Sequence, residues 1–322
     1  MSEHYDAIII GAGISGSAIA YELSQKRYRT LVVDKLSAAG NGSTSNTCAI
    51  IRTHYSTLEG TAFAYDSYFY WKNWKEYIGV DDELGLAVFH ETGCQVIKPK
   101  GFDQSKTLEM NDELGIPYET WDPDKLLATM PHFVDDSFYP PKRPEDPTFS
   151  DPPTDTINPT VIFFPTAGYI NDAVLSVHNI QRAAESKGAQ FLFKAEVAEI
   201  QKQHNRVTGI TLADGRQFEA PVVVNAAGPH SFVINRMAGV EDSMKIKTKA
   251  LRHEVVFVPS PEEFSYEQDG CVVSDGDVGG YHRPETGNQI LVGSEDPPCD
   301  PKEWIEDPDH FNRNVTEDQF KA

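Results

Sequence analysis

A glycine-rich turn at residues 11–16 carries the clearest chemical signal in the sequence. Its glycines Gly11, Gly13 and Gly16 have the G-x-G-x-x-G spacing that is typical of dinucleotide-binding turns. The first glycine permits a tight turn, the second lets backbone amides approach a pyrophosphate, and the third lets a helix pack closely on a strand. The helix N-terminus offers free N–H groups to the phosphates. The candidate phosphate-binding residues are Gly11, Ala12, Gly13, Ile14, Ser15 and Gly16.

The elements that must position this turn are also visible. Residues 7–10 form an unbroken aliphatic run, as in a parallel strand buried on both faces, and apolar residues then follow at helical spacing. A second apolar run ends at Asp34, whose carboxylate is placed to accept hydrogen bonds from the ribose diol of an adenosine. Because a 2′-phosphate would be repelled there, NADP is disfavoured. A turn without a ligand is the alternative, but strand, helix and acid stand in the order that the motif requires. Lys35, next to the acid, joins the candidate site.

A polar stretch at residues 40–48 leads into Arg52. Its small hydroxyl residues Ser43 and Thr44 would let a planar ring approach the backbone, and an arginine can stabilise negative charge. These residue types make Ser43 and Thr44 candidates for binding a planar group and Arg52 a candidate for stabilising its charge. A surface salt bridge is the plain alternative for the arginine.

Length, charge and cysteine content limit the classes of protein to which the chain can belong. A chain of 322 residues can form a sizeable core and about two domains. The net charge of −21, from 49 acidic and 28 basic residues, disfavours nucleic acid and anionic membranes as partners and is compatible with cationic small molecules. The four cysteines have no C-x-x-C pair, so neither a metal site nor a disulfide framework is predicted. We expect small buried or half-buried thiols.

No apolar run approaches the length of a membrane-spanning helix, and the first strand begins too early to leave room for a signal peptide. The sequence therefore predicts a soluble, cytoplasmic protein without an integral membrane segment.

The middle of the chain predicts a change of architecture. Residues 61–80 suit a helix with an aromatic packing face, and residues 86–90 and 94–97 suit a hairpin that turns at Thr92 and Gly93. Prolines crowd residues 140–159, which indicates an irregular surface loop.

From residue 163 the pattern returns to helices and buried strands. A helix begins with Asn171 or Asp172 as N-cap and ends at Gly188. Strands follow at residues 191–193 and 195–197, a hairpin turns at residues 214–215, and residues 221–225 form a buried strand before an Asn-Ala-Ala-Gly turn. Further strands are expected at residues 251–258, 270–273, 280–284 and 290–293.

The glycine motif and Asp34, together with a second motif, resemble the D-amino-acid oxidase superfamily of FAD-dependent oxidoreductases. The second motif is G-S-x-x-x-x-x-x-I-I-R-x-x-Y, formed by Gly42, Ser43, Ile50, Ile51, Arg52 and Tyr55. The closest branch is the sarcosine oxidase and dimethylglycine dehydrogenase group. The resemblance implies an α/β fold in which both domains are discontinuous. A Rossmann-type FAD-binding domain would take residues 1–85 and 163–240, and a β-rich substrate domain would take residues 86–162 and 241–322.

The resemblance also implies roles for later residues. Val197 would offer its backbone to the adenine, and Ala227 and Gly228 would lie near the dinucleotide, which favours FAD over NAD. The polar loop would lie beside the flavin ring. Three residues of one strand would face the substrate cavity: Tyr281, His282 and Arg283. Taken singly, each could equally be a strand residue with its polar tip in water.

The implied reaction is hydride transfer from the carbon next to nitrogen of a small secondary or tertiary amino acid to the flavin, followed by hydrolysis of the imine. Arg52 would stabilise the reduced flavin, and Tyr281 or Arg283 would hold the substrate carboxylate. The partners would be this amine substrate and an electron acceptor. Two alternatives remain open: a 2-hydroxyacid or glycerol-phosphate dehydrogenase, and a flavin-binding assembly protein without turnover.

Three departures from the family give further expectations. Asn46 stands where dimethylglycine dehydrogenases carry a histidine, so no histidyl–flavin bond is expected. No lysine stands at residues 290–293, where sarcosine oxidases place one to promote the reaction with oxygen, so a dehydrogenase is favoured over an oxidase. The family's C-terminal glycine-rich segment has no counterpart, so we expect a truncated or split form in which a second polypeptide could supply the rest.

Overall fold

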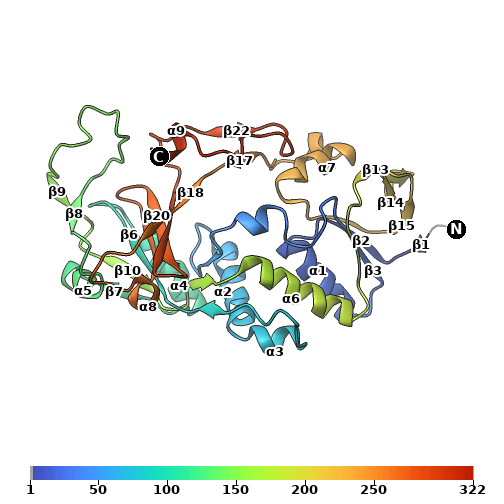
Figure 1. Cartoon of the computed structure of the whole chain (residues 1–322), viewed down its shortest axis with the longest axis horizontal. Coiled ribbons are helices and arrows are strands. Elements are labelled where there is room, and N and C mark those ends of the chain that lie inside the picture. The colour runs from blue at the N-terminus through green and yellow to red at the C-terminus, as the bar shows by residue number, and fades with distance from the viewer. Residues whose placement is uncertain (1–2, 322) are drawn as a thin grey trace.

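A four-stranded parallel sheet lies at the end of the molecule that holds the N-terminus (Figure 1). The structure, a computed structural model, describes residues 3–321. The strand order is β12-β3-β2-β16, and each pair is parallel. The strands are Gln190–Leu192 (β12), Thr30–Val33 (β3), Ala7–Ile10 (β2) and Val223–Asn225 (β16). They come from two distant parts of the chain, as the sequence predicts for a discontinuous domain.

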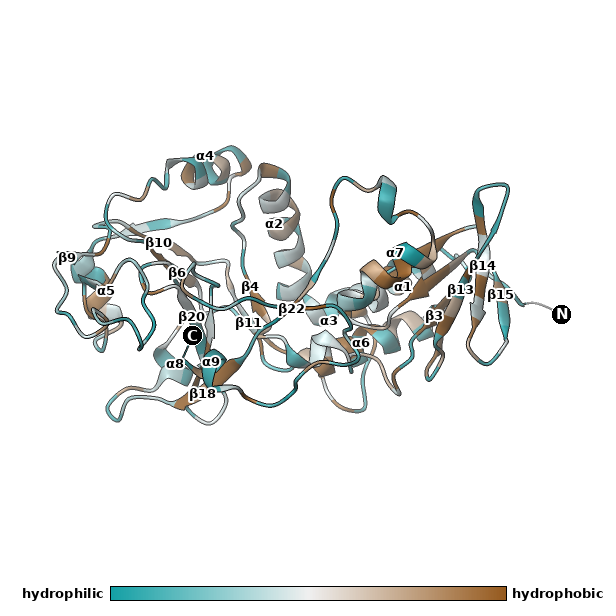
Figure 2. Ribbon diagram, turned by 90° about the horizontal axis from the view of Figure 1, so that it is seen from above, coloured by the Kyte–Doolittle hydropathy of each residue, from teal (hydrophilic) through white to brown (hydrophobic). Residues whose placement is uncertain are grey.

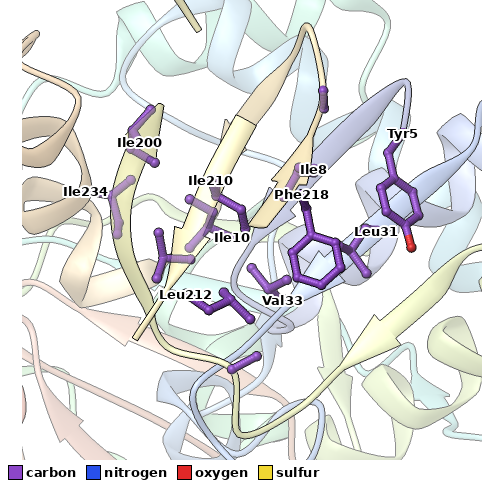
Figure 3. Packing of buried hydrophobic residues seen from close by; sticks show 13 residues of the cluster. Tyr5, Ile8, Ile10, Leu31, Val33, Ile200, Ile210, Leu212, Phe218 and Ile234 are labelled. Carbon is purple, nitrogen blue, oxygen red and sulfur yellow. The ribbon is translucent and has the colours of Figure 1, made fainter. Parts of the chain in front are cut away.

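This sheet is the middle layer of three. On one face, Ile9 and Val32 pack against helices α1 (Ile14–Gln25) and α6 (Ala173–Ser186). On the other face, Ile8 and Ile10 meet a second four-stranded sheet (Figure 3). That sheet consists of β1 (Glu3–His4), β13 (Val197–Gln203), β14 (Arg206–Leu212) and β15 (Gln217–Glu219); β1 pairs with β15 in parallel, the other pairs are antiparallel, and α7 (Ser231–Met237) closes its edge. Alternate residues of β2 therefore bury opposite faces, which explains its unbroken aliphatic run.

A seven-stranded mixed sheet forms the other end of the molecule (Figure 1). Its order is β18-β21-β20-β19-β6-β10-β7. The strands are Val255–Pro259 (β18), Gln289–Ser294 (β21), Gly280–Glu285 (β20), Val272–Asp275 (β19), Cys94–Ile97 (β6), Val161–Phe164 (β10) and Glu119–Trp121 (β7). Three helices accompany it: α4 (Ser105–Leu114), α5 (Pro123–Thr129) and α8 (Tyr266–Asp269).

Smaller elements connect the two ends. A three-stranded sheet joins β4 (Ile50–Ile51), β11 (Gly168–Ile170) and β5 (Phe89–His90). The strands β17 (Ala250–Arg252) and β22 (Glu303–Ile305) pair in a strap that runs along one side of the molecule, before α9 (Glu317–Phe320), as Figure 2 shows. The strands β8 (Asp136–Ser137) and β9 (Asp155–Thr156) form a separate pair. Within the described residues 3–321 there are also three 3-10 turns: Ser43–Asn46, Gly228–His230 and Glu241–Ser243. The assignment of domain boundaries at the residues given above remains a prediction.

Most of the local predictions are confirmed. Asp172 is the N-cap of α6 and accepts a hydrogen bond from the N–H of Leu175 at 2.8 Å, and Gly188 follows this helix with a φ of 96°. The strands β14 and β15 form the hairpin that turns at residues 214–215. Residues 140–159 lie mostly exposed, as expected for the proline-rich loop. All four cysteines are free thiols, two of them buried and two half-buried. None of the helices within residues 3–321 combines the length and apolarity needed to cross a membrane.

The hairpin predicted at residues 86–97 is wrong. Its two halves belong to different sheets, because β5 pairs with β11 while β6 pairs with β10 and β19. Gly93 is the residue at which the chain passes from one sheet to the other. It has a φ of 77°, and the ring of Phe163 fills the space where a Cβ would stand.

Two other predicted elements are interrupted. The aromatic helix is divided at Asn73 into α2 (Leu58–Lys72) and α3 (Trp74–Ile78). Its aromatic residues do not share one packing face, since Tyr68 and Trp74 are buried while Phe63 is 77% exposed. The strand predicted at residues 251–258 consists of the separate strands β17 and β18, which pair in different sheets.

A glycine comparison tests this crossing point. We expect Gly93→Ala to lower the unfolding temperature much more than Gly101→Ala. Both glycines have φ near 78°, at 77° and 79°, but nothing lies within 4 Å of a Cβ at Gly101, whereas one at Gly93 would meet Phe163 at 2.2 Å. The control loses about 1 kcal/mol from backbone strain alone, and the clash adds roughly 1–3 kcal/mol of overpacking. Equal unfolding temperatures for the two variants, measured by circular dichroism, would contradict this role of Phe163.

Candidate functional site

The glycine turn is held by direct contact between backbones. Gly11 has a φ of 106°, and a Cβ there would lie 2.4 Å from the carbonyl oxygen of Ala226. A Cβ on Gly16 would lie 1.9 Å from the carbonyl oxygen of Gly11. The helix α1 begins after Gly13 without a hydrogen bond from any capping side chain. Apart from the N–H of Ile14, which donates to Oγ1 of Thr44, the N–H groups of its first turn are therefore left for an anion, which fits a pyrophosphate.

The carboxylate of Asp34 is oriented at the end of β3. One oxygen accepts a hydrogen bond from the N–H of Ala12 at 2.7 Å, and the other accepts one from the N–H of Leu36 at 2.8 Å. Each carboxylate oxygen can accept a further bond, so the group can still receive the two hydroxyls of a ribose.

Lys35 forms an ion pair with Asp309, which follows the strap strand β22. Its Nζ donates to Asp309 at 2.5 Å and lies 3.0 Å from Nε2 of His230. Burial alone would raise the pKa of Asp309, but the hydrogen bonds from Lys35 and His230 outweigh burial and hold the pKa below its ordinary value. The predicted role of Lys35 in cofactor binding remains a prediction, and the structure shows that its ammonium also ties the strap to the end of β3.

Two further segments meet the glycine turn. The N–H of Ile14 donates to Oγ1 of Thr44 at 3.3 Å, and a Cβ on Gly228 would lie 3.3 Å from Oγ of Ser43. The structure thus brings together the predicted residues 11–16, 43–44 and 227–228. Val197 is buried at the start of β13. These groups form a cradle of backbone amides, small side chains and one carboxylate, which fits a dinucleotide.

Arg283 is a buried link between the two ends of the molecule. It is 3% exposed, and its three nitrogens donate to the carbonyl oxygen of Cys48 at 2.5 Å, the carbonyl oxygen of Pro284 at 2.6 Å and the carboxylate of Glu285 at 2.9 Å. Its guanidinium also lies 4.6 Å from the ring centre of Tyr169. These contacts fix the loop before Arg52 against β20.

Arg52 has the opposite character. It is exposed and lies 4.5 Å from the ring centre of Tyr55. Within residues 3–321 no carboxylate forms an ion pair with it, so its charge is not compensated locally. Of the two predicted arginines, Arg52 is therefore the better placed to bind an anionic group.

Tyr281 and His282 point to opposite faces of the seven-stranded sheet. The ring of Tyr281 covers Gly293, where a Cβ would lie 2.4 Å from its hydroxyl. Burial, together with the thiol of Cys48, raises the pKa of Tyr281 well above its ordinary value, so the phenol stays protonated and can donate. His282 instead bonds Tyr266 on the far face, so its predicted place in the substrate cavity is wrong.

His54 was not identified from the sequence, because nothing in its local pattern separates it from other loop residues. Its ring stacks on Phe164 at 4.2 Å, and its Nδ1 is buried without a hydrogen-bond partner within residues 3–321. Burial, followed by the charges of Arg52 and Lys98, lowers the pKa of His54 to about 3. The imidazole is therefore neutral at physiological pH and lies in a region of positive potential.

The fold agrees with the comparisons with known proteins. The family model described as FAD dependent oxidoreductase (DAO) matches residues 6–321, and the chain therefore belongs to this family. The dinucleotide of the family is FAD, which the cradle around residues 11–16 fits.

Individual relatives are oxidases and dehydrogenases of amino acids. The chain is 26% identical to monomeric sarcosine oxidase of Bacillus sp. (strain B-0618) over 276 residues, which cover 84% of this chain and 61% of that protein. It is 30% identical over 108 residues to human peroxisomal sarcosine oxidase, covering 33% of this chain and 26% of that protein. The chain thus spans less than two thirds of the length of these relatives.

Solved structures show the same fold. The L-proline dehydrogenase from P. horikoshii aligns with a TM-score of 0.76 at 20% identity, covering 99% of this chain and 75% of that chain. The glycine oxidase from Geobacillus kaustophilus aligns with a TM-score of 0.69 at 18% identity, covering 98% of this chain and 75% of that chain.

The carboxylate of Asp34 gives a prediction on cofactor affinity. We expect Asp34→Ala to weaken FAD binding roughly tenfold to a hundredfold, because hydrogen bonds to a charged group contribute about 1.5–3 kcal/mol. Fluorescence quenching of FAD on titration with apoprotein measures the dissociation constant. Asp214→Ala, on the β14–β15 hairpin, is the matched control and should leave it unchanged. Equal affinities for the Asp34 variant and the parent protein would refute the assignment.

The buried imidazole of His54 gives a prediction on pH dependence. The pKa of His54 is about 3 in the folded chain and about 6.5 in the unfolded chain, so between these two pH values only the unfolded chain binds a proton at this residue. Stability is therefore lost as the pH falls below 6.5, at a rate of up to about 1.4 kcal/mol per pH unit.

A phenylalanine keeps the stacking on Phe164 but cannot titrate. Denaturant unfolding from about pH 7 to about pH 4 should therefore show a shallower loss of free energy for His54→Phe than for the parent protein. His253→Phe, at an exposed position, serves as the control and should keep the parent slope. If both variants keep that slope, His54 is not the group that resists protonation.

Proposed function

We propose that the protein is an FAD-dependent oxidoreductase that oxidises the C–N bond of a small secondary or tertiary amino acid, of sarcosine, dimethylglycine or glycine type. The observation that carries this proposal is the uncompensated Arg52, on a loop that Arg283 fixes next to the predicted flavin site. An exposed guanidinium without a carboxylate partner, carried by a loop that is itself held in place, favours a substrate that brings its own carboxylate. The names of the relatives, sarcosine oxidase and glycine oxidase, support the same substrate class.

Bound FAD supplies the hydride acceptor, and the chain binds and orients the substrate. Arg52 would hold the substrate carboxylate, with the protonated phenol of Tyr281 as a second donor. The hydride leaves the carbon next to nitrogen with its electron pair, the nitrogen lone pair forms the C=N bond, and water then adds to release the amine from the carbonyl product.

The substrate nitrogen must be neutral for this step, because an ammonium has no lone pair. The surroundings of His54, two residues from Arg52, support this requirement: burial, followed by the charges of Arg52 and Lys98, lowers the pKa of that base. An amine bound in the same field would release its proton more readily than in water.

We further propose that the enzyme is a dehydrogenase more than an oxidase. Leu291 is buried in the middle of the strand β21, where the family resemblance would put an oxygen-promoting lysine. Arg283 pairs with Leu291 across the sheet, but Glu285 at 2.9 Å compensates its charge. Formation of superoxide would therefore lack a free positive charge from this strand. Peroxide formation in air as fast as turnover with artificial acceptors would contradict this.

Anaerobic bleaching of the flavin tests the reaction class. The FAD-loaded protein should be bleached by one or more N-methyl amino acids and by none of a matched set of 2-hydroxy acids or glycerol phosphate. Bleaching by the hydroxy acids alone would establish the rival dehydrogenase, and FAD binding without bleaching by either set would indicate a protein without turnover.

The role of Arg52 gives a prediction of its own. Arg52→Ala should raise the substrate concentration for half-maximal bleaching by roughly tenfold to a hundredfold, since it removes a charge-assisted hydrogen bond. Arg206→Ala, an exposed arginine on the β13–β14 hairpin, is the control and should change nothing. An N-methyl amine without a carboxylate should bleach the parent and the Arg52 variant alike. If the variant raises the concentration for half-maximal bleaching by this amine as much as it does for the amino acid, Arg52 does not bind the carboxylate.

A further inference from the structure

A cavity of about 200 Å³ lies against the seven-stranded sheet, between β20, β21, α8 and the segment after α5. Its walls are aromatic and aliphatic, with His132 near the exposed surface. No lysine, arginine or carboxylate lines it. Six residues define its shape: Met130, Phe133, Phe264, Tyr266, His282 and Val292.

This cavity is not the predicted substrate site. Successive residues of a strand point to opposite faces of the sheet. Arg283 contacts Cys48 on the face toward the flavin loop, so His282 points away from that loop and into the cavity. The strand β20 therefore separates the two sites.

A tyrosine–histidine pair forms the polar part of the cavity. The hydroxyl of Tyr266 lies 2.6 Å from Nδ1 of His282. Burial lowers the pKa of His282 to about 4 and raises that of Tyr266 far above its ordinary value, so both groups are neutral at pH 7. The hydroxyl of Tyr266 also lies 3.4 Å from the carbonyl oxygen of Cys271, but its contact with Nδ1 is much the shorter of the two. We therefore assign the hydroxyl proton to the bond with Nδ1, which places the imidazole proton on Nε2.

The Nε2 proton has no acceptor within residues 3–321, and Nε2 is not sealed from small molecules. Phe133 packs edge-on against the imidazole with ring centres 5.6 Å apart, and Phe264 packs in the same way against Tyr266 at 5.9 Å. The cavity thus offers one fixed donor among aromatic walls. A ligand oxygen that reaches this donor would form a hydrogen bond that a purely apolar ligand cannot form.

We propose that this cavity is a second ligand site, which binds a neutral, one-ring aromatic molecule through a single acceptor oxygen. The size supports this, since an apolar cavity of about 150 Å³ in another protein binds benzene. The absence of cationic lining residues and the net charge of −21 disfavour an anion. The oxygen would accept from Nε2 of His282 while the ring packs among Phe133, Phe264 and Met130.

Two probes of similar shape test the proposal on the FAD-loaded protein. Acetophenone carries the acceptor oxygen and ethylbenzene does not, so acetophenone should bind several-fold more tightly, as expected for one net hydrogen bond of about 1 kcal/mol. Isothermal titration calorimetry measures both affinities. His282→Phe should remove the preference while keeping the apolar walls. The absence of acetophenone binding, or equal binding of the two probes to the parent protein, would overturn the proposal.

A second pair of variants locates the site. Val258 lies at the rim of the cavity and is 38% exposed, so Val258→Trp can fill the cavity without entering the core. Its neighbour Phe257 points to the other face of the same strand, so Phe257→Trp is the matched control. Only the first variant should abolish acetophenone binding, and the flavin absorption spectrum should stay unchanged on binding. Binding that perturbs this spectrum and survives Val258→Trp would place the ligand in the active site and refute the second site.

Discussion

The structure depends on the close approach of three backbone segments around the glycine turn, at residues 11, 16 and 226. A Cβ on Gly11 would lie 2.4 Å from the carbonyl oxygen of Ala226, and a Cβ on Gly16 would lie 1.9 Å from the carbonyl oxygen of Gly11. Neither position can therefore carry a side chain. This contact locks β2, α1 and β16 into one unit, and β2 carries the rest of the parallel sheet on its other edge. Because the packing uses glycine on both sides, the first turn of α1 is held open beside Asp34 and Thr44. The contact of Gly11 with Gly16 and Ala226 therefore serves both the folding of this end of the molecule and the shape of the cofactor site.

The second constraint is the connection between the parallel sheet and the seven-stranded sheet. The strand β10 belongs to the large sheet, and only a few residues later β11 pairs with β4, which precedes Arg52. Thr53 and Thr166 share a buried hydrogen bond of 2.9 Å at the same place. Arg283 completes this connection by reaching from β20 to the carbonyl oxygen of Cys48. Several short contacts thus hold the loop of Arg52, and none of them uses the guanidinium of Arg52 itself.

The sequence predicted what depends on local pattern and failed where a long-range contact decides. The glycine spacing, the run at residues 7–10 and the cap at Asp172 each have a cause within a few neighbouring residues, and all are confirmed. The turn at Gly93 looked like a hairpin, but its conformation serves a passage between sheets that depends on the distant Phe163. The two candidate arginines could not be ranked either. Whether a guanidinium is free or committed depends on partners such as Cys48, which lies far from Arg283 in the chain.

The charge of the chain bears on both charged ends of the proposed substrate. A net charge of −21 repels anions at long range, but that repulsion is screened beyond about 8 Å at physiological salt, whereas a direct contact is not. The local excess of positive charge is small: Arg52 has Lys98 nearby, and the imidazole of His54 stays neutral between them. A carboxylate that reaches Arg52 can therefore be compensated by direct contact. The amine of the proposed substrate would approach this acidic chain as a cation and lose its proton on burial. Long-range and local electrostatics thus act on different ends of the proposed substrate: the overall charge attracts its amine, and the local positive charge binds its carboxylate.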